Sequence, residues 1–292
     1  MPSYFHEFRD ADGNEVRAFH DSSDCVNGEE HDWSDARDNE DGSSERVCVK
    51  CGMGAMHHGL MTAEDVTPLG KCEGCARGIY TKVDGKVPPL CQRCRNDAAA
   101  KFLVEKRTRE LRAMYSEEHR RYHTFEHLND MTRTAEKNHI ELSTEQLMAI
   151  WFHDCVYRVP RDPDESNEEA SAKLAVKWMR DVGLGERFIW TVEHIILDTE
   201  DEIPRLRASA AVIDLDLWQL SNDDFWKNEP LIREEFGLLT DEQWLNGRRA
   251  FLQKMLARDS IFVSEHATPE MEAAARRNLQ TAMQQLERDD DE

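Results

Sequence analysis

The sequence predicts an all-α domain preceded by a small, loop-rich module that binds metal. Apolar residues recur at helical spacing from about residue 101 onward. Seven of the eight cysteines lie before that point, and strand signals are limited to short pieces such as residues 79–85. We therefore expect a metal-binding module over residues 1–100 and a helical domain over residues 101–288.

The helical domain is expected to contain a series of helices with recognisable ends. The first contains neither glycine nor proline. Ser143 or Thr144 is placed to cap the second helix through a capping box. Ser166 or Asn167 is placed to cap the third, and Gly183 to end it. The expected helices span residues 101–139, 143–157, 166–182, 185–198, 206–221, 229–236, 241–258 and 270–287.

The charge of the chain limits its partners. The 37 basic and 59 acidic residues give a formal net charge of −22, which would repel a nucleic-acid backbone unless basic residues cluster locally. No apolar run approaches the roughly 18 residues that a membrane-spanning helix needs. The first residues, MPSYFHEFRDADGNE, lack the basic start and apolar stretch of a secretory signal. We expect a cytoplasmic protein with no membrane partner.

Six of the cysteines fall in three Cys-x-x-Cys pairs, which in a reducing compartment indicate metal ligation rather than disulfides. The pairs Cys72/Cys75 and Cys91/Cys94 are separated by 15 residues. Two such pairs can present four thiolates tetrahedrally, as zinc prefers. The linker is expected to form a short hairpin, as in a zinc ribbon.

The remaining N-terminal candidates could form a second zinc site of three cysteines and one histidine. They are Cys25, His31, Cys48 and Cys51. His57 or His58 could replace the histidine. The module would therefore hold one or two structural zinc ions. It is expected to fold an appendage or dock a protein first, and to bind nucleic acid second, because its surroundings are acidic.

Three of the expected helices carry ionisable residues where apolar core residues are expected. These residues are His123 and His127, the adjacent His153 and Asp154, and the pair Asp214 and Asp216. A spacing of four would place His123 and His127 on one helical face. Burying such groups among apolar residues is costly. A divalent cation would remove that cost, because imidazole and carboxylate both ligate metals. Together, the three helices predict a metal site.

Several motifs follow one another in this part of the chain. They are Arg120-Arg121-Tyr122-His123 with His127, Trp151–Tyr157, Asn167–Ala172, Asp214–Leu217, Ile232-Arg233 with Glu235, and Gly247-Arg248. With these motifs the chain resembles the HD superfamily of metal-dependent phosphohydrolases. Within it, the likeness is closer to a bacterial and phage group of predicted phosphohydrolases. The resemblance covers about residues 110–282 and excludes residues 1–100.

The resemblance implies an all-α HD-type domain with one divalent metal, which could be Mn, Fe, Co, Ni or Zn. The implied ligands are His127, His153, Asp154 and Asp216, with Asp214 as the alternative to Asp216. The chain departs from the group near residue 199, where a histidine is expected and the sequence runs Leu197-Asp-Thr-Glu-Asp-Glu202. His194, one helical turn earlier, could substitute.

Neighbouring motif residues are expected to bind the phosphate and to protonate the leaving group. The catalytic candidates are His123, Glu168, Glu169 and Arg120, and the substrate-binding candidates are Arg121 and Tyr157. The histidine could orient phosphate or protonate the leaving oxygen. One glutamate could act as acid or base, while the other is a helix-start carboxylate. Either arginine could clamp phosphate. Candidates for stacking on a base are Tyr122, Trp151, Tyr157, Trp178 and Trp218.

These residues predict hydrolysis of a phosphate ester by metal-activated water. A nucleotide is the expected substrate by analogy with the family. The alternative is a non-catalytic HD fold that senses a nucleotide or binds nucleic acid or protein. A third interpretation, a nuclease, is disfavoured by the net negative charge.

Overall fold

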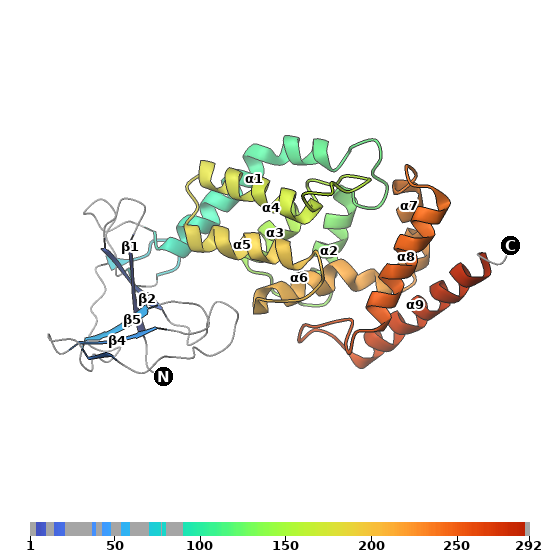
Figure 1. Cartoon of the computed structure of the whole chain (residues 1–292). Coiled ribbons are helices and arrows are strands. Elements are labelled where there is room, and N and C mark those ends of the chain that lie inside the picture. Colours follow the sequence, from blue (N-terminus) through green and yellow to red (C-terminus); the bar gives the residue numbers. More distant parts are fainter. Residues whose placement is uncertain are drawn as a thin grey trace. The chain divides into compact units, whose positions relative to one another are not determined.

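The computed structural model describes residues 71–76 and 90–288 with their side chains, and residue 289 and short strands elsewhere by backbone alone (Figure 1). The chain divides into two compact units, Met1–Ala98 and Ala99–Glu292. This division falls two residues before the expected boundary.

The described strands of the first unit form small antiparallel sheets. Their bounds are β1 Tyr4–Arg9, β2 Glu15–His20, β3 Arg37–Asp38, β4 Ser43–Val47, β5 Gly54–His58, β6 Gly70–Lys71 and β7 Gly78–Ile79. β1 pairs with β2, the second sheet has the order β3-β4-β5, and β6 pairs with β7. The hairpin expected in the linker at residues 78–90 lies almost wholly outside the described residues.

In the described part of the chain from Gln92 onward, every regular element is a helix. The bounds are α1 Gln92–Met114, α2 Phe125–Lys137, α3 Thr144–Phe152, α4 Asn167–Asp181, α5 Glu186–Asp198, α6 Arg207–Leu217, the 3₁₀ turn η2 Trp218–Ser221, α7 Asp224–Glu235, α8 Asp241–Leu256 and α9 Pro269–Asp289. The prediction of an all-α domain is confirmed for these residues.

The caps that start these helices are local features, and the two predicted ones are present. Ser143 caps α3 in a capping box with Gln146, and Ser166 caps α4 in one with Glu169. Gly183 follows α4 with φ of +75°, a conformation that glycine adopts without strain. A third box at Thr240 opens α8 and was not predicted.

The prediction of one continuous helix over residues 101–139 was wrong. α1 ends at Met114, and α2 begins at Phe125. Residues between them make a few local turn hydrogen bonds and also bond to distant groups. Arg120 donates to the carbonyls of Asp154 and Cys155, and the Glu235 carboxylate accepts from the backbone of the same loop. These long-range bonds satisfy polar groups that would otherwise require a helix.

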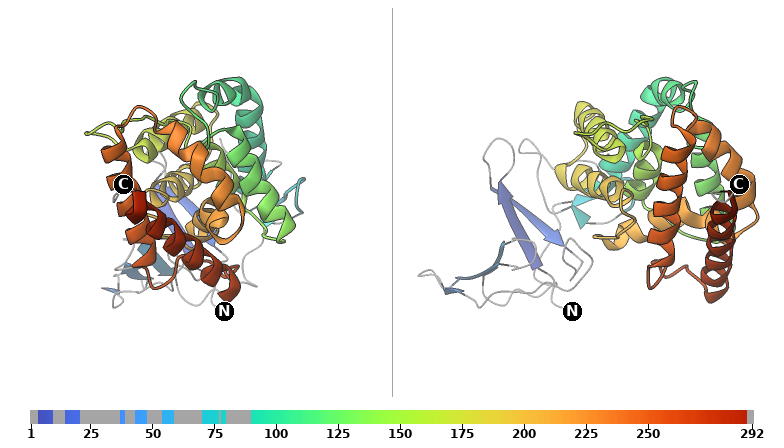
Figure 2. Two further views of the ribbon diagram at one scale, coloured as in Figure 1. Left: turned by 90° about the vertical axis from the view of Figure 1, so that its right-hand side faces the viewer. Right: turned by 45° about the vertical axis from the view of Figure 1, so that its right-hand side comes forward.

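The second unit contains two hydrophobic clusters that meet at α6. The larger one is built from α1 to α6, with fully buried side chains such as Leu103, Phe152 and Ile195. The smaller one is built from the end of α6, η2 and α7 to α9, around Phe225 and Leu252. Figure 2 shows α8 and α9 side by side, in agreement with their contacts. α6 therefore connects both cores, and it carries the pair Asp214 and Asp216.

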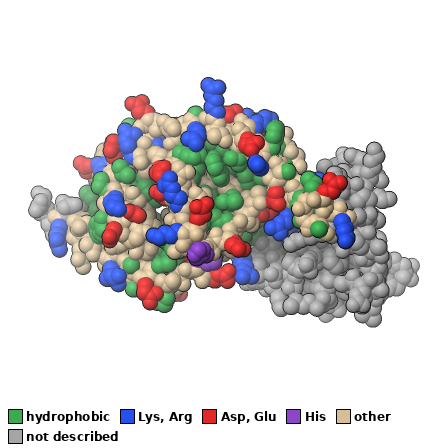
Figure 3. Space-filling view, turned by 180° about the vertical axis from the view of Figure 1, so that it is seen from behind, with side chains coloured by type: hydrophobic (Ala, Val, Ile, Leu, Met, Phe, Trp, Pro, Cys, Tyr) green, Lys and Arg blue, Asp and Glu red, His purple; other side chains and the backbone are tan. Residues whose placement is uncertain are grey.

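Charged and apolar side chains are mixed on the surface. On the face shown in Figure 3, lysine and arginine side chains lie among aspartate and glutamate around a central group of apolar side chains. Among the described residues, no helix has the length and apolar character that crossing a membrane requires.

Candidate metal centre and adjoining cavity

Four of the predicted metal ligands converge from three helices. His127 lies in the first turn of α2, His153 at the C-terminal cap of α3, and Asp154 directly after it. Asp216 lies in the last turn of α6. The side chains of His127, His153 and Asp154 are buried, and their candidate ligand atoms lie within 4.8 Å of one another. This group could therefore hold a metal ion.

The donor separations match those around a divalent cation. His127 Nε2 lies 2.9 Å from Asp216 Oδ1, and His153 Nε2 lies 3.1 Å from Asp154 Oδ2. His153 Nε2 is also 3.7 Å from Asp216 Oδ1. With metal–ligand bonds of about 2.1 Å, adjacent ligands of an octahedral ion are about 3.0 Å apart. The site therefore needs little rearrangement to accept a cation.

Two buried nitrogen atoms point to the same conclusion. The Nε2 atoms of His127 and His153 are both buried, and neither makes a hydrogen bond of good geometry, although carboxylate oxygens lie 2.9 Å and 3.1 Å away. Such orphaned groups are rare because each costs desolvation energy without a compensating bond. His153 Nδ1 lies 3.0 Å from the carbonyl oxygen of Ile150, so Nδ1 carries the proton and Nε2 has a lone pair available for a metal.

This bond depends on a helix end that the sequence analysis did not predict. His153 and Asp154 were expected inside a helix, but α3 ends at Phe152.

The electrostatics of the site favour positive charge. Burial lowers the pKa of His153, but the Asp154 and Asp216 carboxylates outweigh burial and hold it well above the ordinary value. Burial would raise the pKa of Asp216, yet the adjacent imidazoles of His127 and His153 hold it well below its usual range. The carboxylates thus stabilise a proton on the imidazole, and a divalent cation would take that proton's place.

The structure distinguishes the two aspartates of α6. The Asp214 carboxylate accepts backbone N–H bonds from Val263 (2.8 Å) and Ser264 (2.9 Å), which lie in the loop before α9. Asp216 faces His127 and His153 instead. Two residues along a helix differ by about 200° around its axis, so the two side chains leave α6 in different directions. The alternative ligand Asp214 is therefore engaged in fastening α6 to the loop.

His123 is placed beside the metal ligands, although not by the predicted route. It lies before Thr124, the N-cap of α2, so the expectation of one helical face shared with His127 was wrong. The two rings are nevertheless 5.8 Å apart between centroids. The His123 ring stacks on Tyr157 at 4.2 Å, and its Nδ1 lies 2.5 Å from Glu235 Oε1. Tertiary contacts, not helical spacing, hold His123 at the site.

Neither predicted arginine lines the cavity beside the metal group. Arg120 is buried and donates to the carbonyls of His123, Asp154 and Cys155, while its Nε bonds Glu117. Its burial and these contacts make it a support for the loop and not a phosphate clamp. Arg121 donates to Glu234 Oε1 at 2.6 Å on the surface. The prediction that either arginine clamps phosphate was therefore wrong.

The two glutamates at the start of α4 have different positions. Glu169 belongs to the capping box, with Oε2 accepting from the Ser166 N–H. The prediction of a catalytic role for Glu169 was therefore wrong, and this residue is the helix-start carboxylate. Glu168 is 6 % exposed and lines the cavity, and its Oε2 has no hydrogen-bond partner. Burial raises its pKa, opposed by Arg161, whose Nη2 lies 3.1 Å from Oε1. Glu168 is thus suited to carry a proton.

A cavity of about 490 Å³ opens beside the metal group. Its lining includes His153, Asp154 and Asp216 together with residues of α7 and α8. Tyr122 and Tyr157 line it, whereas Trp151, Trp178 and Trp218 contribute to the hydrophobic core. Three of the five predicted stacking residues are therefore structural.

Sequence reasoning missed much of the cavity wall. Glu200 and Glu202 line it where a histidine was expected, whereas His194 stacks on Trp190 and bonds its carbonyl. The contribution of α8, including Trp244 and Gly247, was also missed. Gly247 in the middle of an amphipathic helix was the available indication. Glycine lowers the stability of a helix, so its presence there suggests that space beside the helix is needed.

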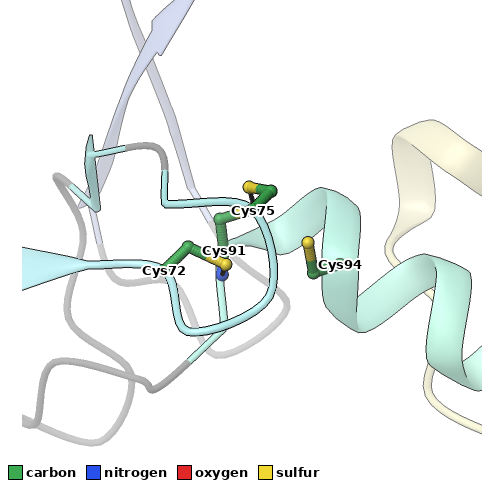
Figure 4. Close-up of side chains that lie close together, drawn as sticks. All are labelled: Cys72, Cys75, Cys91 and Cys94. Carbon is green, nitrogen blue, oxygen red and sulfur yellow. Dashed lines mark hydrogen bonds between the residues drawn. The ribbon is translucent and has the colours of Figure 1, made fainter.

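The four cysteines Cys72, Cys75, Cys91 and Cys94 form a second metal-ligating group. Figure 4 shows three of them in loops and Cys94 on the first turn of α1. Their sulfur atoms all lie within 4.8 Å of one another. Cys75 Sγ and Cys91 Sγ are 3.7 Å apart, close to the edge of about 3.8 Å for a tetrahedron with Zn–S bonds of about 2.3 Å. The group could therefore hold a metal ion.

The surroundings of the cysteines favour thiolate at one position. A backbone N–H bond from Cys91 to Cys72 Sγ, at 3.2 Å, lowers the Cys72 pKa to about 6. Hydrogen bonding with Cys75 raises the Cys94 pKa to about 12. A Cβ at Gly74 would lie 3.1 Å from Cys94 Sγ, so glycine leaves room for the sulfur. The predicted second zinc ligands Cys25, His31, Cys48 and Cys51 lie outside the described residues.

Comparison with protein-family models, curated proteins and solved structures found no match for this chain.

Proposed function

We propose that the second unit is a metal-dependent phosphohydrolase of the HD type, acting on a phosphate ester, with a nucleotide as the expected substrate. The observation that carries the proposal is the convergence of the buried imidazole nitrogens of His127 and His153 with the Asp154 and Asp216 carboxylates, at separations that suit a shared cation better than hydrogen bonds. Two neutral imidazoles and two carboxylates suit Mn, Fe, Co, Ni or Zn. A bound cation would neutralise a phosphate oxygen and lower the pKa of water towards about 7.

The protein's own residues would supply the remaining steps. Glu168, whose pKa is raised by burial, would donate a proton to the leaving oxygen. His123, held by Glu235 and Tyr157, would orient the phosphate. The half-buried walls of the cavity would limit the access of bulk water to the reacting groups. Glu168 and His123 line the same cavity as the ligands His153, Asp154 and Asp216.

We also infer that the four-cysteine group holds a structural zinc ion. All-thiolate tetrahedral sites prefer zinc and have no open position for substrate. The same cysteines imply a reducing compartment, which supports a cytoplasmic location. Folding an appendage or docking a protein remains the role we propose for the first unit.

The two aspartates of α6 allow a sharp test of the catalytic proposal. We expect Asp216→Asn to lower turnover of nucleoside phosphates by at least about 100-fold in the presence of Mn, Co or Ni, and to lose the metal of this site. Asp214→Asn should keep metal and turnover while losing about 1–3 kcal/mol of stability, because it fastens the loop before α9. His139→Asn, an exposed change, is the control.

The measurements are phosphate release, metal content by mass spectrometry and unfolding by denaturant. Metal loss from Asp214→Asn with retention by Asp216→Asn would reverse the ligand assignment. Tight nucleotide binding without turnover of any ester by the unmodified protein would instead favour the nucleotide sensor.

A further inference from the structure

The part of the cavity wall that α7, α8 and the turn between them supply is largely apolar. Its apolar lining residues are Ile232, Phe236, Leu239, Trp244 and Phe251. The rings of Phe236 and Trp244 lie 5.6 Å apart between centroids. These aromatic side chains are half-buried, so a ligand against them would remove apolar surface from water.

The cationic side chains around the cavity are already paired. Arg161 pairs with Glu168 at 3.1 Å, and Lys254 pairs with Glu202. Arg248, which is buried, pairs with Glu229 through Nε at 3.2 Å. Among the described lining residues, no cation without a carboxylate partner remains.

One further carboxylate on the cavity wall adds negative charge. Glu200, which is exposed, lines the cavity, and no ion pair is seen for it among the described residues. A second anionic group of a ligand would be repelled by this carboxylate. The wall thus disfavours a chain of phosphates beyond the one at the metal.

Gly247 leaves space in this wall. It lies on the cavity side of α8 between Trp244 and Phe251, and a Cβ built on it would have no atom within 4 Å. Glycine in a helix interior costs about 1 kcal/mol relative to alanine. At this position the lack of a side chain exposes the helix backbone to the cavity, so that a flat group could lie against it.

We propose that the α7–α8 wall is the subsite for the leaving group, and that it takes a planar, uncharged heteroaromatic group carried by a single phosphate. This inference rests on the proposed phosphohydrolase function, which places the phosphate at the metal. The aromatic wall binds the ring, and Gly247 provides the room for it. Because the cations of the wall are already paired with carboxylates, none is left to bind a second phosphate. The substrate class is therefore a nucleoside monophosphate and not a sugar phosphate or a nucleoside triphosphate.

The test compares adenosine 5′-monophosphate with ribose 5-phosphate, which differ only in the base. The unmodified metal-bound protein should show a kcat/KM at least about 10-fold higher for the nucleotide, as expected for one apolar contact group. Gly247→Leu should remove this preference by lowering kcat/KM for the nucleotide at least about 10-fold relative to kcat/KM for ribose 5-phosphate. Asn246→Leu, which adds the same side chain at an exposed neighbouring position on α8, is the matched control. Both changes favour helix, so folding should be retained.

Calorimetric binding of adenosine separates this inference from the proposed function. Adenosine that binds the unmodified protein, and binds Gly247→Leu at least about 10-fold more weakly, supports the subsite even without turnover of any ester. Turnover with equal kcat/KM for both phosphates and no adenosine binding overturns the subsite and leaves the phosphohydrolase standing. Equal losses for Gly247→Leu and Asn246→Leu also overturn it.

Discussion

Glu168 shows how burial can change the acid–base chemistry of a single side chain. The second residue of α4 would ordinarily be a solvated carboxylate interacting with the helix dipole. In this protein, only one of its oxygens is paired, with Arg161, and burial raises its pKa. The same physical cost explains the metal site, where buried imidazoles and carboxylates are tolerable because a cation can compensate for them.

Glu168→Gln tests the proton-donor role at the residue scale. A raised pKa means that the protonated, donating form persists to higher pH and is lost as pH rises through that value. We expect the substitution to lower kcat by about 10²–10⁴-fold. It should also remove the fall of kcat at high pH that deprotonation of Glu168 causes. Glu169→Gln, one residue further along α4, is the comparison, with kcat profiles measured from pH 5 to 9. An unchanged profile for Glu168→Gln would contradict the role.

At the element scale, α7 is fastened to the loop before α2 by one carboxylate. Glu235 is 1 % exposed and accepts the backbone N–H groups of Arg121, Tyr122 and His123, besides contacting the His123 ring. Burial would raise its pKa, but the hydrogen bond with His123 and these N–H groups lower it to about 2. Because α7 also forms part of the cavity wall, this bond holds the two ends of the candidate site in one arrangement.

Glu235→Gln should destabilise the protein by about 1.5–3 kcal/mol at pH 7, because hydrogen bonds to a charged acceptor are lost. The folded pKa of Glu235 lies below the ordinary 4.5, so its contribution is present above pH 4.5 and lost as pH falls towards 2. The difference between the two proteins should therefore shrink on acidification.

Denaturant unfolding at pH 7 and pH 3.5 measures this difference. Glu234→Gln is the matched control, since this neighbouring residue is exposed and its pairing with Arg121 contributes little. A difference between Glu235→Gln and the unmodified protein that stays constant over this range would disprove the linkage.

At the scale of the whole molecule, α1 begins in the four-cysteine group and continues into the second unit. Cys91 and Cys94 stand at its start, whereas Ala100, Leu103 and Leu111 are buried in the larger hydrophobic cluster. Zinc-bound thiolates and a hydrophobic core are independent sources of stability. The later part of α1 should not need the metal in order to remain helical.

The double change Cys91→Ser and Cys94→Ser tests this independence. We expect the bound zinc to fall by one ion per chain, while helical circular dichroism and the metal of the His127 site are retained. Metal content by mass spectrometry and far-ultraviolet circular dichroism measure the two effects. Collapse of the helical signal together with the zinc would show that the first unit is required to fold the second.

Local features of this protein were predictable because they depend on neighbours in the chain. The boxes at Ser143 and Ser166 and the stop at Gly183 each involve residues no more than a few positions apart. The paired spacing of Cys72/Cys75 and Cys91/Cys94 likewise predicted a cluster that the structure brings together. The apolar period also identified the later helices, although α7 starts at Asp224, five residues before the predicted start.

By itself, the sequence determined which segments are helical, where several of them are capped, and which residue types could bind metal. The tertiary structure decided which side chains face one another. It turned Asp216 towards the histidines and Asp214 towards the loop before α9, buried Arg120 under carbonyl groups, and brought Glu235 to His123, 112 residues away. Local hydrogen bonding and the repeat of apolar residues along the sequence specify a helix. The direction in which each face of the helix points is fixed only when distant elements pack against it.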